Sequence, residues 1–413
     1  MPNETRTIRL SGPQWAIFNS PARFRVLNAG RRFGKTFLAC TELFVRGQNK
    51  PGSMNWYVAP TYRQAEQIAW AQLKDMIPRG YIRGKNETDL RIELKNKSVI
   101  ALRGADNPDS LRGVGLDFVV PDESAFQKRE VWTEALRPAL SDRQGSALFI
   151  TTPAGYNWFY DLYCAAKGKP DWATFQYTTL DGGNVPAEEI QAARSELDER
   201  TFRQEYEASF ESLSGRVYYA YDRDENARAL ADDPAAPLLV GMDFNVNPMS
   251  AVFAVRAGDQ IHFIGEQLIP NGNTDDMAKA IRARFPGRPV KVYPDPTGNS
   301  RKTSAPVGQT DFSILRAAGF QVLAPTHPYA VADKINTVNA AMKSAAGIRR
   351  AYIDPVKCPA LAKGLDGLTY REGTNEPDKS LGLDHVTDAA AYLLLWELPM
   401  KVRFATGIKL GAV

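Results

Sequence analysis

The stretch from Val26 to Thr36 constrains the fold of this 413-residue chain more than any other. A short apolar run ends in small residues, and Gly34-Lys35-Thr36 then leads into a second apolar segment. This order of strand, glycine-containing loop and helix is typical of a phosphate-binding loop, in which backbone N–H groups and the positive end of the helix dipole face phosphate oxygens. A plain turn with a solvated lysine is the alternative interpretation.

The residue types in the loop predict what each group does. Lys35 is expected to reach the β- and γ-phosphates of ATP, and the Thr36 hydroxyl to hold its Mg²⁺. The usual pattern places glycine five positions before Gly34, where this chain has Ala29 followed by Gly30. The predicted nucleotide-binding residues of the loop are Ala29, Gly30, Arg31, Arg32, Phe33, Gly34, Lys35 and Thr36.

A pair of acids supplies the second signal. The apolar segment from Leu116 to Pro121 ends in Asp122 and Glu123. Asp122 is predicted to bind the nucleotide's Mg²⁺ from the strand adjacent to the loop strand. Glu123 is predicted to position and deprotonate the water that attacks the γ-phosphate. A charged loop after a buried strand is the alternative, but the loop and the acid pair in this order favour an ATP hydrolase.

Other residues of the first half are candidates for supporting roles. Thr151 and Thr152 end a buried strand and are candidates for sensing loss of the γ-phosphate. Gln14 and an aromatic ring precede the loop and are candidates for recognising the edge and face of adenine. The alternative is that Trp15 and Phe18 only pack the entry helix. Arg32 in cis, or Arg112 from a neighbouring subunit, is a candidate for stabilising transition-state charge. For both arginines an exposed or DNA-facing position is the alternative.

The length of the chain and the change in composition along it predict two domains. Alternating strands and helices indicate an α/β domain with a parallel sheet over residues 1–210. The polar and proline-rich segment 211–237 is predicted to be a linker, and 238–413 a second domain. No apolar run approaches the ~18 residues of a membrane span, and no signal peptide is expected.

The cysteine content and the net charge further restrict what kind of protein this is. Three widely spaced cysteines without a CxxC pair indicate reduced thiols in a cytoplasm and argue against a structural zinc site. The net charge of +4 is too small to establish nucleic-acid binding by itself. The basic pairs Arg301-Lys302 and Arg349-Arg350 are compatible with it.

The second half carries three acids in a pattern typical of ribonuclease H. Two strands from 250 to 268 form a hairpin after a strand that ends in Asp243, and a later strand ends in Asp295. Asp388 lies in the first turns of the last helix. These acids are predicted to bind Mg²⁺ or Mn²⁺, whose hard character suits carboxylate oxygens, and to cut a phosphodiester.

Three further residues near these acids are left with alternatives. Asp384 lies four residues before Asp388 and is either the third metal ligand or a helix cap. His385 either binds metal and orients water or packs at the surface. Asp354 also follows a strand, but it is a weaker candidate for a metal ligand than the other acids.

Together these motifs resemble the large terminase subunit of tailed bacteriophages over nearly the whole chain. The resemblance is carried by the loop at 29–36, by Asp122-Glu123, by Ile150-Thr-Thr-Pro153, and by Asp243, Asp295 and His385-Val-Thr-Asp388. It implies a P-loop ATPase domain of the RecA/ASCE type followed by a ribonuclease H-like nuclease domain. The loop deviates in many members of that family, so Ala29 does not oppose the assignment.

The resemblance also implies a function and partners. The ATPase would drive double-stranded DNA into a procapsid, and the nuclease would cut the concatemeric genome with Mg²⁺ or Mn²⁺. A small terminase subunit, a portal protein and a ring of five copies are the expected partners, in the host cytoplasm and not in the mature virion. The chain after Leu398 is short, so no long portal-docking extension is expected.

Three alternatives remain at this stage. A helicase or translocase would have a second half that only binds DNA. A noncatalytic assembly protein would bind nucleotide as a structural switch. A transposase-like integrase would more naturally carry a glutamate on its last helix.

Overall fold

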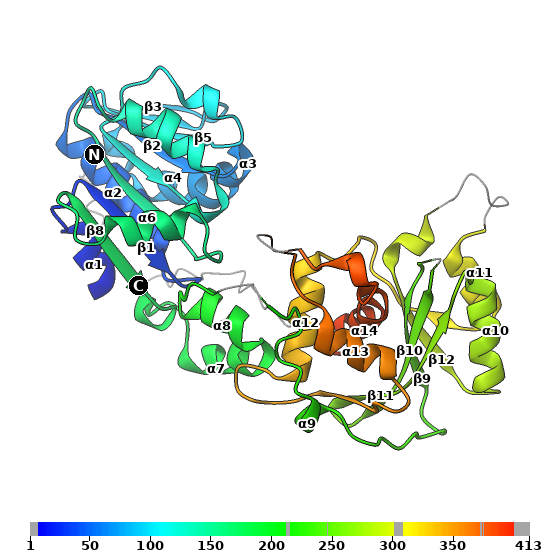
Figure 1. Cartoon of the computed structure of the whole chain (residues 1–413). Helices are drawn as coiled ribbons and strands as arrows, with labels where there is room; N and C mark the ends of the chain where they lie inside the picture. The colour runs from blue at the N-terminus through cyan, green and yellow to red at the C-terminus, as the bar shows by residue number, and fades with distance from the viewer. Residues whose placement is uncertain are drawn as a thin grey trace. The chain divides into compact units, whose positions relative to one another are not determined.

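The computed structural model describes residues 7–211, 215–245, 247–300, 309–371, 374 and 376–399. These residues form two compact α/β units (Figure 1). The described residues of Met1–Ile190 and Arg203–Ser212 form unit 1, and those of Gln191–Phe202 and Leu213–Val413 form unit 2. None of the described helices is long and apolar enough to cross a lipid bilayer.

Unit 1 is built on an eight-stranded sheet with the order β3-β4-β5-β2-β6-β7-β1-β8. The strands from β5 to β8 in this order run parallel, and β3 and β4 form an antiparallel hairpin at the edge. Their bounds are β1 Phe24–Ala29, β2 Met54–Ala59, β3 Ile82–Asn86, β4 Arg91–Leu94, β5 Val99–Gly104, β6 Phe118–Pro121, β7 Ser146–Thr151 and β8 Trp172–Tyr177.

Helices cover both faces of this sheet, as the burial of β1 shows. All six residues of β1 are buried, and Leu27 faces one core, with Leu38 of α2, while Val26 faces the other, with Phe159 of α6. A central parallel strand buried on both sides reads as a continuous apolar run for this reason. The helices of unit 1 are α1 Gly12–Phe18, α2 Lys35–Asn49, α3 Tyr62–Ala65, α4 Ala71–Met76, α5 Arg137–Ala139 and α6 Trp158–Ala166, with π-helical segments at Glu66–Trp70 and Val131–Leu136.

The sheet order corrects the expected neighbour of the loop strand. The prediction that Asp122 follows a strand adjacent to the loop strand is wrong, because β7 lies between β6 and β1. Parallel strands place their carboxyl ends on one edge of a sheet, so the end of β7 lies between the loop and the acid pair. Sequence order alone does not show which strand is inserted between two others.

The units divide the chain at places other than the predicted boundaries. Helix α7, Ala187–Glu196, and helix α8, Glu199–Tyr206, each contain residues of both units. Within the segment predicted as a linker, Val217, Tyr218 and Tyr221 are buried in the core of unit 2. The short helix α9, Arg223–Asn226, lies in the same segment.

Unit 2 contains a six-stranded sheet with the order β13-β12-β9-β10-β11-β14. The central strand β9 is antiparallel to β10 and parallel to β12, and β10 and β11 form the expected hairpin. This mixed sheet with a carboxyl-terminal helix on it is the ribonuclease H-like arrangement. The bounds are β9 Leu238–Asp243, β10 Met249–Ala257, β11 Gln260–Ile269, β12 Val290–Pro294, β13 Gln321–Val322 and β14 Ala351–Ile353.

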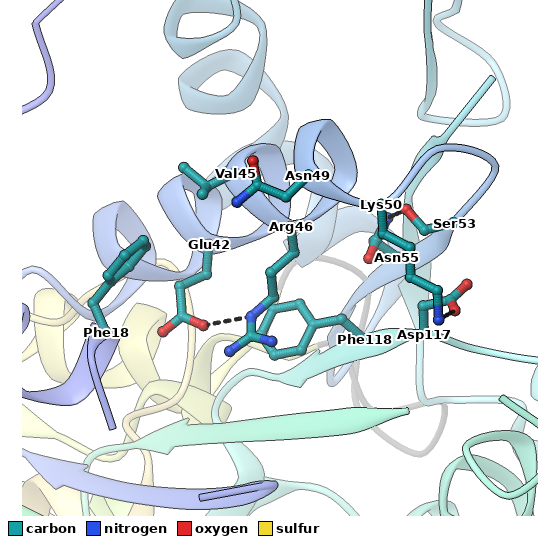
Figure 2. Close-up of a pocket in the computed structure, with 10 residues that line it drawn as sticks. All are labelled: Phe18, Glu42, Val45, Arg46, Asn49, Lys50, Ser53, Asn55, Asp117 and Phe118. Atoms are coloured by element: carbon teal, nitrogen blue, oxygen red, sulfur yellow. Dashed lines mark hydrogen bonds and ion pairs between the residues drawn. The ribbon is translucent and has the colours of Figure 1, made fainter. Parts of the chain in front are cut away.

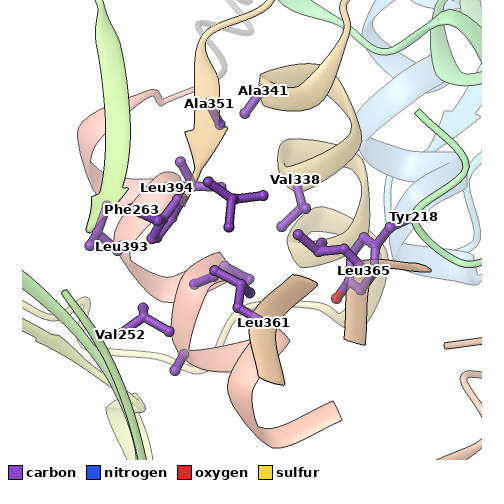
Figure 3. Packing of buried hydrophobic residues seen from close by; sticks show 14 of the residues in the cluster. Tyr218, Val252, Phe263, Val338, Ala341, Ala351, Leu361, Leu365, Leu393 and Leu394 are labelled. Carbon is purple, nitrogen blue, oxygen red and sulfur yellow. The ribbon is translucent and has the colours of Figure 1, made fainter. Parts of the chain in front are cut away.

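Two apolar cores hold the helices of unit 2 against this sheet. Figure 3 shows one of them, where Leu393 and Leu394 of α14 pack with Val252, Phe263 and Val338. The other core includes Met277 of α10. The helices are α10 Thr274–Arg284, α11 Asp311–Ala317, α12 Val331–Met342, α13 Pro359–Gly367 and α14 Asp384–Glu397.

A glycine lets α14 approach the acid-bearing strand. Gly241 lies two residues before Asp243 on β9, and a Cβ added there would be 2.0 Å from the carbonyl oxygen of Ala389. Contacts between α14 and β9 are extensive, so the backbone of the helix has no room to move aside. This close approach brings Asp388 toward the end of β9.

Gly241→Ala is therefore expected to destabilise unit 2 by about 3 kcal/mol, because the new methyl group overpacks a helix–sheet contact. Urea unfolding curves measure the change in the free energy of unfolding. Gly84→Ala is the control, because a Cβ added at Gly84 meets nothing within 4 Å. A free energy of unfolding of Gly241→Ala within about 0.5 kcal/mol of the parent value would contradict the role assigned to this glycine.

Candidate functional site

The predicted phosphate-binding loop connects β1 to α2 at the carboxyl end of the parallel strands. Arg32, with φ 62°, and Gly34, with φ 96°, turn the backbone through the left-handed region before the helix begins. Gly34 is the N-cap of α2, and no side chain caps the first amides of the helix. Because these N–H groups have no partner within the helix, they form a site suited to an anion.

The departure at Ala29 has a structural explanation. Ala29 is the last, fully buried residue of β1, and the close backbone approach falls on Gly30 instead. A Cβ on Gly30 would lie 2.6 Å from the carbonyl oxygen of Tyr206. The next residue, Arg31, donates its N–H to the carbonyl of Glu205 at 2.7 Å and pairs with the Glu205 carboxylate. The end of α8 therefore fixes the first half of the loop.

Side-chain amides hold the second half of the loop. The buried Gln14 donates from Nε2 to the carbonyl of Gly34 at 3.3 Å, and Asn184 donates to the carbonyl of Phe33 at 3.1 Å. Gln14 also closes a capping box with Ser11. The amide of Gln14 thus supports the loop in this structure, and adenine recognition by this residue stays a prediction.

Lys35 links the loop to the end of β7. Its Nζ donates to the carbonyls of Ala29 at 2.8 Å and Gly30 at 3.1 Å, and to Oγ1 of Thr152 at 3.0 Å. Burial lowers the pKa of Lys35, and the nearby carboxylates of Glu123 and Asp122 oppose that shift. A buried ammonium between two acids and a phosphate-binding loop is placed to interact with an anionic ligand.

The acid pair lies at the carboxyl end of β6. Asp122 is buried and accepts a hydrogen bond from the Tyr57 hydroxyl and, at 2.8 Å, from the N–H of Glu123. Burial, with the negative charge of Glu123, raises the pKa of Asp122. Gln127 donates to the carbonyls of Val58 and Asp122 at 2.9 and 2.7 Å, which fixes the strand end.

Glu123 has a strained backbone, with φ 48° and ψ 46°. A non-glycine residue in the left-handed region is uncommon, and such strain is concentrated at functional sites. The carboxylate accepts a hydrogen bond from Thr151 Oγ1 at 3.2 Å. Thr151 and Thr152, at the end of β7, thus contact Glu123 and Lys35 respectively.

The structure places the two candidate arginines differently. Arg32 is exposed within the loop itself, and no hydrogen bond or ion pair of its side chain is seen in the described part of the chain. Arg112 pairs with Asp109 at 3.2 Å and with Glu134 at 2.9 Å on the surface of unit 1. Only Arg32 belongs to the loop within a single copy of the chain.

The fold brings the predicted acids of unit 2 together. Asp243 ends β9, and Asp295 directly follows the neighbouring strand β12, where its N–H donates to the carbonyl of Met242 at 3.0 Å. Asp388 lies one turn into α14, which packs on β9, β10 and β12. Burial, with the negative charge of Asp388 and Asp295, raises the pKa of Asp243.

These acids, and Asp384 as well, each lie beside a hydrogen-bond donor from the same unit. His385 Nδ1 lies 3.2 Å from Oδ2 of Asp243, Lys334 Nζ lies 2.7 Å from Oδ2 of Asp388, and Lys379 Nζ lies 3.2 Å from Oδ2 of Asp384. Asp295 caps the turn that follows it by accepting from the Thr297 N–H at 2.8 Å.

These pairings affect the fit of a metal ion. As arranged, the described residues contain no group of three or more His, Cys, Asp or Glu side chains that could hold a metal. The chemistry of the donors still fits Mg²⁺ or Mn²⁺, since carboxylate oxygens are the ligands that hard divalent cations prefer. Asp384, in the first turn of α14, is a partner of Lys379 rather than the N-cap.

The remaining candidates have structural roles in unit 2. Asp354 pairs with Lys357 at 3.0 Å and accepts from the Leu230 N–H at 3.2 Å, away from the other acids. Arg349 donates to Asn226 at 2.6 Å. The pair Arg301-Lys302 lies outside the described residues.

A cavity of about 360 Å³ lies elsewhere in unit 1, at the amino ends of β2 and β6 (Figure 2). Its charged groups neutralise one another: Glu42 pairs with Arg46 at 3.0 Å, and Asp117 pairs with Lys50 at 2.6 Å. The phosphate-binding loop is at the opposite, carboxyl edge of the parallel strands. This cavity is therefore separate from the predicted nucleotide site.

The residues of these sites that were not predicted from sequence include Tyr57, Gln127 and Lys334. Tyr57 lies in β2, paired with β6, so its place beside Asp122 depends on strand order. Lys334 is one of several buried polar residues of α12, so its position in the sequence did not distinguish it.

The two units define a class of protein. A P-loop fold with an acid pair at the end of a nearby strand is followed by a ribonuclease H-like fold with clustered acids. Chains of this class join a nucleotide-binding domain to a nuclease-type domain.

Comparison with known proteins shows which family the first unit is similar to. Residues 26–223 match the family described as terminase large subunit, T4likevirus-type, N-terminal. The terminase large subunit of Escherichia phage T5 is 32% identical over 263 residues, which cover 60% of each chain, and that of Thermus phage G20c is 32% identical over 285 residues, which cover 59% of each. Over residues 26–223 the chain is similar to the amino-terminal part of terminase large subunits.

The chain spans about 60% of the length of the curated relatives it matches. A solved structure extends the likeness of fold over both units. The large terminase of a thermophilic bacteriophage, solved also in complex with ATP-gamma-S, superposes with a TM-score of 0.64 at 17% identity. The superposition covers 94% of this chain and 99% of that one.

Proposed function

We propose that this chain is an ATP-driven DNA-packaging motor with a metal-dependent endonuclease. One observation carries the proposal: Glu123 is held in a strained conformation beside Asp122 and Thr151, at the strand edge that also bears the phosphate-binding loop. Terminase relatives over most of unit 1 support it. The second site, at Asp243, Asp295 and Asp388, adds cutting to translocation.

In unit 1, the loop amides and Lys35 bind the β- and γ-phosphates of ATP, and Thr36 and Asp122 hold Mg²⁺. Glu123 orients a water molecule and accepts its proton as the water attacks the γ-phosphate. Thr151 contacts Glu123 and Thr152 contacts Lys35. Loss of the γ-phosphate therefore changes contacts on β7, which connects to α6.

In unit 2, Asp243, Asp295 and Asp388 would hold one or two Mg²⁺ or Mn²⁺ ions. When bound, these ions would supply charge stabilisation for the attacking water and the leaving 3′ oxygen. His385, beside Asp243, orients water in the site. The substrate is concatemeric double-stranded DNA. A small terminase subunit, a portal on the procapsid and a ring of five copies complete the machine in the host cytoplasm.

Plasmid digestion tests the nuclease half against a helicase without nuclease activity. The full chain is incubated with supercoiled plasmid and Mn²⁺, with EDTA as the control. Linear and nicked products that require Mn²⁺ are expected, whereas an intact plasmid beside active ATP turnover would favour the helicase.

Arg32→Ala is expected to lower steady-state ATP turnover by about 10³-fold, because an arginine in the loop stabilises transition-state charge in cis. Arg112→Ala is the matched variant, since it removes a surface arginine from the same unit. In the isolated chain, ATP turnover by Arg112→Ala is expected to stay within about twofold of the parent rate, because the exposed ion pairs of Arg112 contribute little. Loss of turnover in Arg112→Ala with normal turnover in Arg32→Ala would reverse the assignment.

A further inference from the structure

A buried lysine faces the acids of unit 2. Lys334 lies on α12 with 9% of its surface exposed, and its ammonium is 2.7 Å from Oδ2 of Asp388. The same ammonium lies 5.2 Å from the ring centre of Tyr392, one turn further along α14. Lysine is almost never fully buried unless it is paired, so its position depends on the acid.

We propose that Lys334 is an internal counter-ion that holds the Asp388 carboxylate and competes with a divalent cation for it. The inference rests on the proposed nuclease function. Asp388 presents one oxygen to Lys334, so a cation approaching this carboxylate meets a positive charge that is already in place. Lys334 is thus a positioning residue that keeps the affinity for metal low.

The surroundings of Lys334 make this competition strong. The side chains of Lys334 and Asp388 are 11% and 18% exposed, so little water screens the charges. The Lys334 ammonium, 2.7 Å from Oδ2 of Asp388, offsets the negative charge of that carboxylate directly. Removing the ammonium leaves that charge available to a metal.

A second lysine provides the matched control. Lys379 pairs with Asp384 on the same helix at 3.2 Å, but its side chain is 63% exposed. Water and salt screen an exposed pair, so its effect on a nearby cation is small. The two lysines therefore separate the effect of a buried charge from that of any lysine near the acids.

The test is a titration of the metal-free full chain with Mn²⁺, in which electron paramagnetic resonance measures free Mn²⁺. Lys334→Met keeps the apolar stem and removes the charge, and is expected to bind Mn²⁺ about tenfold more tightly than the parent. Lys334→Gln serves as a second neutral variant if the first does not fold. Lys334→Arg and Lys379→Met are expected to stay within about twofold of the parent.

The outcomes are distinguishable. If the parent binds Mn²⁺ and the neutral variants at Lys334 bind it equally or more weakly, the counter-ion role is overturned while the nuclease proposal stands. If the parent binds no Mn²⁺ at all, the proposed nuclease site fails, and the inference fails with it. Tighter binding in Lys334→Arg as well would show that the positive charge is irrelevant.

Discussion

Glu123→Gln is expected to lower the rate of ATP hydrolysis by about 10²–10⁴-fold while ATP binding is retained. The amide keeps the size of the side chain and its contact with Thr151, but it accepts no proton from water. The strained backbone of Glu123 points to a position required for function rather than for stability. Steady-state phosphate release measures turnover, and fluorescence with a labelled nucleotide measures binding.

Glu134→Gln is the control for this variant. Glu134 is a half-exposed acid of the same unit, paired with Arg112 at 2.9 Å. Its removal should leave turnover unchanged. If Glu123→Gln hydrolyses ATP at the rate of an active parent, Glu123 is not the group that accepts the proton from water. If the parent itself turns over no ATP, unit 1 binds nucleotide only as a switch, as in a noncatalytic assembly protein.

Asp243→Asn is expected to reduce plasmid cleavage by about 10³-fold, because a metal ligand supplies several kcal/mol of transition-state stabilisation. The amide fits the same space at the end of β9, so the fold should be retained. ATP turnover, which takes place in unit 1, should not change. Gel analysis of plasmid incubated with Mn²⁺ measures the loss.

Asp259→Asn provides the comparison for cleavage. Asp259 is an exposed acid in the turn between β10 and β11, on the same unit but away from the cluster. The Asp259→Asn variant should cut plasmid at the parent rate. Equal cleavage by Asp243→Asn and the parent would remove Asp243 from the metal site.

Local sequence signals predicted the elements that carry the sites. The loop after β1, the hairpin of β10 and β11, and the last helix with Asp388 are confirmed, because each depends on turn residues and apolar periodicity within a short window. The predicted order of two domains, a P-loop fold followed by a ribonuclease H-like fold, is confirmed as well.

Long-range arrangements escaped prediction. The insertion of β7 between β6 and β1 depends on how the whole sheet packs. The support of the loop by Glu205 joins residues that lie 174 positions apart. The hairpin of β3 and β4 has mainly exposed side chains in β3, which leave no apolar alternation to read.

The proposed metal site shows the same limit. The sequence pattern singled out Asp243, Asp295 and Asp388 as candidates, but not the donors that pair with them in this structure. Lys334 is 54 residues from Asp388, and its role depends on the packing of α12 against α14. Such a pairing is visible only when both helices are in place.

The most direct test of two separate catalytic sites compares ATP turnover and plasmid cleavage in three preparations: the parent chain, Glu123→Gln and Asp243→Asn. Cleavage is measured in Mn²⁺ without ATP, so that it does not depend on translocation. The account predicts that Glu123→Gln loses only turnover and Asp243→Asn loses only cleavage. Loss of both activities in either variant, with the fold intact by circular dichroism, would contradict it.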